Sequence, residues 1–111
     1  MWDKIRVTFK GEIMKVYNIT SNKGNKIANQ FTIHDDYNNV YFQSYNSIII
    51  KIENYFDNSK SNKTYLDEKY WDYSVTTGKY RNIFLEETKK DTEKKIAKGE
   101  YILTNLNKGV L

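Results

Sequence analysis

The chain has 111 residues, of which 39% are hydrophobic, so one small globular domain spanning residues 1–111 is expected. It contains no cysteine, which excludes disulfides, catalytic thiolates and cysteine-bound zinc. The 18 basic residues exceed the 14 acidic ones, and the net charge of +4 predicts only a mild attraction for polyanions. No signal-peptide core or long apolar segment is present, so we expect a cytoplasmic protein without membrane contact.

The first half of the chain alternates apolar and polar residues with the period of two that half-buried strands require. Polar turns rich in glycine, asparagine and aspartate separate the alternating segments. The isoleucine run at 48–52 predicts either a fifth strand or a bent continuation of the fourth, after a break at Asn46 and Ser47. The strands are expected at residues 4–10, 12–19, 27–34, 40–45 and 48–52, with the first turn at Lys10–Gly11.

The second half predicts one more strand, two helices and a last strand. After a polar loop at residues 54–63, residues 64–71 are expected to pair antiparallel with the isoleucine strand. Residues 77–87 have helical spacing, and a second helix starts at a capping box of Thr88 and Asp91 and ends at Gly99, before a strand at 100–106. The pattern predicts an α+β fold: an antiparallel sheet of five to seven strands with two short helices near the C-terminus.

Three strings resemble a family of small domains of unknown function. They are FQSYNSII at 42–49, WDYSVTTGKYRNIFL at 71–85 and KGEYILTNL at 98–106. This family recurs in phage, plasmid and other mobile-element proteins of Gram-positive and gut bacteria. The resemblance covers about the C-terminal two thirds of the chain, leaves residues 1–33 unmatched and implies a genetic setting without implying a reaction.

The sequence offers little for catalysis, which needs a base with a nucleophile, or a metal cluster. The single histidine, His34, precedes two aspartates, but no further metal ligands are marked, so a polar turn is the better interpretation. Asp67, Glu68 and Asp72 are interpreted as partners of nearby lysines at the surface. We therefore expect no catalytic residue, no metal ion and no cofactor.

The string TTGK at residues 76–79 resembles the end of a phosphate-binding loop. It lacks the first glycine and the spacing that wraps a phosphate. Capping of the first helix by Ser74 and Thr77 is the better interpretation, although a helix start can also offer its amides to an anion.

Aromatic rings and cations alternate most densely between residues 69 and 81. Trp71 and Phe84 are expected to lie in the core and to hold this region rigid. Rings next to cations stack bases and contact phosphates, and they also form hot spots for protein partners. The residues expected to bind a partner are Tyr70, Tyr73, Lys79, Tyr80, Arg81, Lys90 and Lys94.

Two functions follow from this surface and from the resemblance. The first is a non-enzymatic accessory protein that inhibits a host protein or nucleoprotein machine, for example an anti-CRISPR or other counter-defence factor. The alternative is a nucleic-acid-binding protein of a phage or plasmid. Composition and motifs leave both open.

Overall fold

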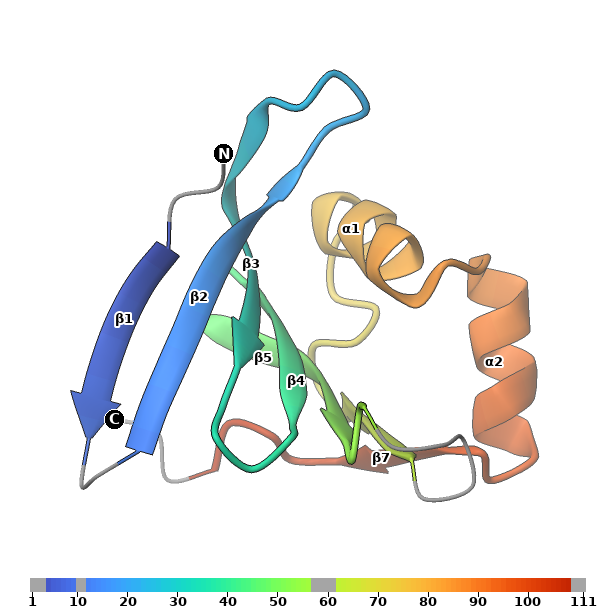
Figure 1. Ribbon diagram of the computed structural model, residues 1–111. Helices are drawn as coiled ribbons and strands as arrows, with labels where there is room; N and C mark the ends of the chain where they lie inside the picture. Colours follow the sequence, from blue (N-terminus) through green and yellow to red (C-terminus); the bar gives the residue numbers. More distant parts are fainter. Residues whose placement is uncertain (1–3, 10–11, 57–61, 109–111) are drawn as a thin grey trace.

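The computed structural model describes residues 4–9, 12–56 and 62–108. In these ranges the chain forms seven strands and two helices (Figure 1). The seven strands form one sheet, in which their spatial order follows the chain order from β1 to β7. The elements are β1 (Lys4–Phe9), β2 (Glu12–Thr20), β3 (Lys26–His34), β4 (Val40–Ser44), β5 (Ser47–Glu53), β6 (Lys63–Asp67), α1 (Val75–Leu85), α2 (Lys89–Ala97) and β7 (Tyr101–Thr104).

The sheet is mixed, with one parallel pair at its end. Each strand from β1 to β6 is antiparallel to its neighbour in sequence, whereas β7 is parallel to β6. The α+β prediction is therefore correct in outline, but the expectation of an antiparallel sheet throughout is wrong. Parallel neighbours need a long crossover connection, and residues 68–100 with both helices supply it.

The strands of the first half follow the predicted segments closely. The isoleucine run forms a separate strand, β5, because the chain reverses at Tyr45, whose positive φ of 55° lies in the left-handed region. The backbone N–H of Tyr45 donates to the carbonyl of Asn29 at 2.7 Å, which fixes this turn against β3. The predicted Lys10–Gly11 turn and residues 57–61 of the predicted loop lie outside the described residues.

Strand β6 ends at Asp67, earlier than the predicted boundary at Trp71. The Asp67 side chain is buried and its Oδ2 accepts hydrogen bonds from the backbone N–H groups of Lys69 and Tyr70, at 3.1 and 2.9 Å. A carboxylate that binds amides two and three residues ahead turns the chain out of the sheet. Tyr70, Trp71 and the residues up to Tyr73 consequently form turns between β6 and α1.

Both helices begin at side-chain caps. Ser74 is the N-cap of α1, and its Oγ accepts the amide of Thr77 at 3.1 Å, so the helix starts two residues before the predicted position. The capping box of Thr88 and Asp91 at the start of α2 is confirmed. Gly99 follows α2 with a φ of 78°, as the predicted glycine end requires.

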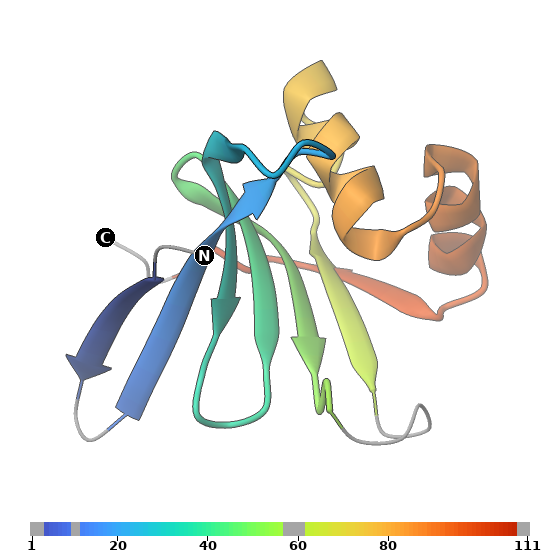
Figure 2. The ribbon, with the colours of Figure 1, turned by 45° about the horizontal axis from the view of Figure 1, so that its top comes forward.

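The helices cover one face of the sheet and complete the core there (Figure 2). The fully buried residues Phe42, Ile49, Ile50 and Leu66 form the centre of the core. Phe42 stacks on Phe84 of α1, with ring centroids 5.6 Å apart. The partly buried residues that pack against this centre are Ile19, Ile52, Tyr70, Trp71, Tyr80, Phe84, Leu85, Ile96 and Tyr101, which include both aromatic residues predicted for the core.

A buried carboxylate joins the two helices to β7. Glu87, between α1 and α2, accepts hydrogen bonds at Oε1 from Lys95 Nζ at 2.6 Å and from the Tyr101 hydroxyl at 2.9 Å. Its Oε2 accepts the hydroxyl of Thr92 at 2.6 Å. Burial and the hydrogen bond to Glu87 raise the pKa of Tyr101 to about 12.

From the raised pKa of Tyr101 we predict that the protein loses stability at high pH. Between about pH 10, where an unfolded tyrosine ionises, and about pH 12, the folded chain keeps a proton on Tyr101 that the unfolded chain releases. The free energy of unfolding should therefore fall as the pH rises through this range. Urea unfolding at several pH values should show a shallower fall for Tyr101→Phe than for the wild type, and equal falls would contradict the assignment.

Candidate binding site

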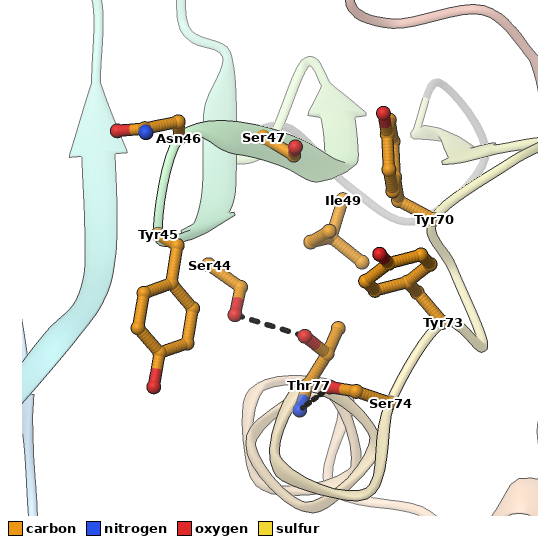
Figure 3. A pocket seen from close by; sticks show the side chains of 9 residues that line it. All are labelled: Ser44, Tyr45, Asn46, Ser47, Ile49, Tyr70, Tyr73, Ser74 and Thr77. Atoms are coloured by element: carbon orange, nitrogen blue, oxygen red, sulfur yellow. Dashed lines mark hydrogen bonds between the residues drawn. The ribbon is translucent and has the colours of Figure 1, made fainter.

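A cleft of about 360 Å³ lies between the β4–β5 turn and the start of α1. Figure 3 shows the side chains that face it. Its lining residues come from three segments, the β4–β5 hairpin, the turns after β6 and the first turn of α1: Ser44, Tyr45, Asn46, Ser47, Ile49, Tyr70, Tyr73, Ser74 and Thr77. The cleft is thus made by residues far apart in the sequence.

The wall between the hairpin and α1 is rigid. The hydroxyls of Ser44 and Thr77 lie 3.0 Å apart and form a buried hydrogen bond, drawn in Figure 3. Ile49 beside them is 1% exposed and gives this wall an apolar surface. Because Ser74 caps the same helix end, this wall of the cleft is held by two hydrogen bonds that are present before any ligand binds.

Two tyrosines form the opposite side. The rings of Tyr70 and Tyr73 meet edge to face, with centroids 5.2 Å apart and planes 70° apart. Tyr70 is half-buried against the core, whereas Tyr73 is 68% exposed. A third tyrosine, Tyr45, is 52% exposed on the hairpin side. The cleft therefore has an apolar base and a rim that carries phenol hydroxyls.

Asp67 positions Tyr70. Besides the amides of the following turn, its carboxylate accepts the backbone N–H of Leu106 at 2.8 Å and the side-chain amide of Asn107 at 3.0 Å, both at Oδ1. Asn107 also exchanges two hydrogen bonds with the backbone of Ile48, at 2.8 and 3.0 Å. The chain after β7 is thereby tied to β5 and to the turn that carries Tyr70.

Arg81 positions the rest of the turn from inside the protein. Its side chain is buried, and its Nη1 donates to the carbonyl of Trp71 at 2.7 Å and lies 3.4 Å from Asp72 Oδ1. Its Nη2 donates to Asn82 Oδ1 at 3.0 Å, and the guanidinium lies over the Trp71 ring, 5.3 Å from the centroid. These contacts hold the residues before α1 against the helix.

Asp72 links this arginine to the second helix. Its Oδ2 lies 2.7 Å from Lys89 Nζ, at the start of α2. The hydrogen bond from Lys89, followed by the charge and hydrogen bond of Arg81, holds the pKa of the Asp72 carboxyl below its ordinary value. The carboxylate therefore stays ionised at neutral pH and neutralises part of the charge of the two cations.

The structure brings only some of the predicted residues together. Tyr70 and Tyr73 line the cleft, while Lys79 and Tyr80 lie on α1 outside it, with Lys79 Nζ 5.3 Å from the Tyr80 ring centroid. Tyr80 is half-buried and packs against the core. Lys90 and Lys94 are exposed on α2, four residues apart, and do not line the cleft.

The prediction that Arg81 belongs to the binding surface is wrong. Arg81 was expected to bind a partner, but it is 1% exposed, so its guanidinium does not reach one. Positions 77, 81 and 84 share the inward side of α1, where Thr77 and Arg81 are buried and Phe84 packs on the core. The dense alternation of rings and cations in the sequence does not reveal this orientation.

Sequence reasoning missed the hairpin side of the cleft, namely Tyr45, Asn46 and Ser47. The predicted break at Asn46 and Ser47 marked a turn there. Its position next to α1 depends on the contact between Ser44 and Thr77, which are 33 residues apart, and no local signal carries that contact.

His34 and the two aspartates after it, the possible metal ligands of the sequence, lie where β3 ends and a turn begins. Asp35 Oδ1 accepts the amides of Tyr37 and Asn39, at 2.8 and 3.0 Å, as a polar turn requires. The His34 ring meets Tyr17 edge to face, and burial and then Lys15 lower the pKa of the imidazole. In the described ranges, no three histidine, aspartate or glutamate side chains gather closely enough to hold a metal ion.

Comparison with protein families matches residues 14–100 to a family of unknown function, DUF8033. The chain belongs to this family. The match begins in β2, closer to the N-terminus than the resemblance noted in the sequence, and it includes every residue that lines the cleft. Neither a search of curated proteins nor a search of solved structures found a match.

Neither helix of the described part has the length and apolar character needed to cross a membrane.

The burial of Arg81 gives a direct test of its positioning role. Arg81→Ala removes three hydrogen bonds and the contact with the Trp71 ring, and it leaves the Trp71 carbonyl without this donor, so the free energy of unfolding should fall by about 2 to 4 kcal/mol. Lys79→Ala, on the exposed side of the same helix, should change it by about 0.5 kcal/mol or less. Urea unfolding measures both, and an Arg81→Ala protein as stable as the wild type would place the guanidinium outside the core.

Proposed function

We propose that this chain is a small non-enzymatic accessory protein of a phage or plasmid that binds and inhibits a host protein or nucleoprotein machine. It acts in the host bacterial cytoplasm as a counter-defence factor, for which an anti-CRISPR protein is the example. The mobile-element setting rests on the resemblance of residues 71–85. Binding through a surface rests on the cleft between α1 and the β4–β5 hairpin.

The observation that favours a protein partner is the absence of charge in the cleft. All nine lining residues are serine, threonine, asparagine, isoleucine or tyrosine, with no lysine or arginine among them. Nucleic-acid grooves depend on cations that neutralise phosphates. Apolar and tyrosine side chains in a small concave surface are typical of the anchor points of protein interfaces.

The rim supports the same conclusion. Tyr73 and Val75 are 68% and 91% exposed, which places large apolar surface next to the cleft. Tyrosine has few rotatable bonds, so it loses little conformational entropy when a partner covers it. Since Asp67 and Arg81 already fix the turn that carries these side chains, binding needs little ordering of the chain.

Nucleic acid remains the alternative because α2 carries exposed lysines. Lys90 and Lys94 lie one turn apart on the outside of this helix, where they can contact phosphates. Lys95 on the same helix is paired with Glu87 at 2.6 Å, so the basic surface is interrupted. A surface of this kind favours weak, salt-sensitive binding over sequence-specific recognition.

A photocrosslinking experiment separates the two functions. The photoreactive residue benzoylphenylalanine replaces Tyr73 at the cleft in one protein and Tyr37 in a control protein. The two tyrosines are similarly exposed, at 68% and 63%, but Tyr37 lies near the opposite end of β4. In bacterial lysate treated with nuclease, the Tyr73 position should crosslink to a defined protein. The additional change Tyr70→Ala should abolish that crosslink by removing one side of the cleft.

Two results would contradict the proposal. Equal crosslinking from positions 37 and 73 would mean that the cleft has no special role. The nucleic-acid function would be favoured by two observations together. The crosslinked partner would disappear after nuclease treatment, and the chain would bind a labelled oligonucleotide with an affinity that falls with salt at a log–log slope of about −0.7 to −0.9 per contact.

A further inference from the structure

A second hollow adjoins the tyrosine-lined cleft. It has a volume of about 680 Å³ and shares Tyr73 and Ser74 with the cleft, so the two hollows meet at the start of α1. Its other lining residues come from α1, from the turn before it and from the start of α2: Asp72, Val75, Gly78, Lys79, Arg81, Asn82 and Lys89.

The second hollow differs from the cleft in its charge. Three of its lining residues are cations, the exposed Lys79 and Lys89 and the buried Arg81, which contributes its charge without reaching a partner, and only Asp72 is an anion. Asp72 contacts Arg81 and Lys89 at 3.4 and 2.7 Å, whereas Lys79 is exposed and lies over the ring of Tyr80. One carboxylate cannot neutralise three cations, so the hollow keeps a positive charge.

The start of α1 adds to this potential. The first turn of the helix holds no acidic residue, so no carboxylate within the helix offsets the positive end of the helix dipole there. At Gly78, which also lines the hollow, an added Cβ would make an ordinary van der Waals contact with the Arg81 guanidinium, 3.5 Å from Nη2. The helix surface at this position therefore lies directly over the guanidinium.

We propose that the partner segment carries a large apolar side chain that fills the tyrosine-lined cleft and, next to it, an acidic group that lies in the basic hollow. This inference rests on the proposed protein-binding function and specifies the chemistry of the partner. Because the hollows share Tyr73 and Ser74, one short segment contacts both. Charge complementarity selects the acidic segment, and the cleft selects its apolar neighbour.

Three blocked tripeptides test the inference: acetyl-Trp-Glu-Glu-amide, its glutamine analogue and its lysine analogue. The full chain, labelled with nitrogen-15, is titrated with each by NMR, to about 10 mM because fragments of this size bind weakly. The glutamate peptide should shift the amides of Tyr73, Val75 and Gly78 and bind about fivefold or more tightly than the glutamine peptide. The lysine peptide should bind most weakly, and raised salt should remove the difference.

Two variants locate the effect. Lys79→Gln should bring the affinities of the glutamate and glutamine peptides close together without changing the fold, since Lys79 is exposed. Tyr37→Ala, at the far end of β4, should leave the preference unchanged. A preference that persists in Lys79→Gln would mean that the acidic group lies elsewhere.

The outcomes separate this inference from the proposed function. Equal affinities for the glutamate, glutamine and lysine peptides, with shifts at the cleft, would overturn the acidic preference and leave protein binding in place. No shifts at the cleft with any peptide would overturn the inference, while crosslinking from position 73 would still report on the function. Tighter binding of an oligothymidylate of about twenty nucleotides at the same amides would assign both hollows to nucleic acid.

Discussion

The buried guanidinium of Arg81 is the contact on which the candidate site depends. It joins α1 to the carbonyl and ring of Trp71 and to the carboxylate of Asp72, which in turn reaches Lys89 on α2. A single cation therefore fixes the turn before α1, the helix itself and the start of the next helix. Removing a charged hydrogen-bonding group from such a position leaves the Trp71 carbonyl without its side-chain donor, so the position of the turn that leads to Tyr73 depends on this residue.

The fold was largely predictable because its signals are local. Alternation predicted the strands, and the Thr88–Asp91 capping box predicted the start of α2. Ser74 was recognised as a cap, although the start of α1 was predicted two residues too late. The end of β6 and the direction of β7 were not predictable in this way. The first depends on Asp67 binding amides of the following turn, and the second on a crossover whose path is set by packing on the sheet.

The candidate site was predicted only in part, for a physical reason. Sequence density of rings and cations identified Tyr70 and Tyr73, but it does not distinguish a cation that faces a partner from one that faces the core, and Arg81 is the second kind. The hairpin side of the cleft, which carries Tyr45, is placed next to α1 by the long-range hydrogen bond between Ser44 and Thr77. The resulting surface is an uncharged cleft beside a basic hollow, and our proposal of a protein segment with mixed character rests on this combination.

Hydrogen exchange of the chain, alone and bound to its crosslinked partner, tests most directly the claim that the cleft is the binding surface. Backbone amides slow their exchange where a partner covers or rigidifies them. The account predicts slower exchange in the segments 44–49 and 70–79, which contain most of the residues that line the two hollows. It predicts no change in the turns at 35–39 and 54–56, at the other end of the sheet. Protection confined to those distant turns, or to α2 alone, would contradict it.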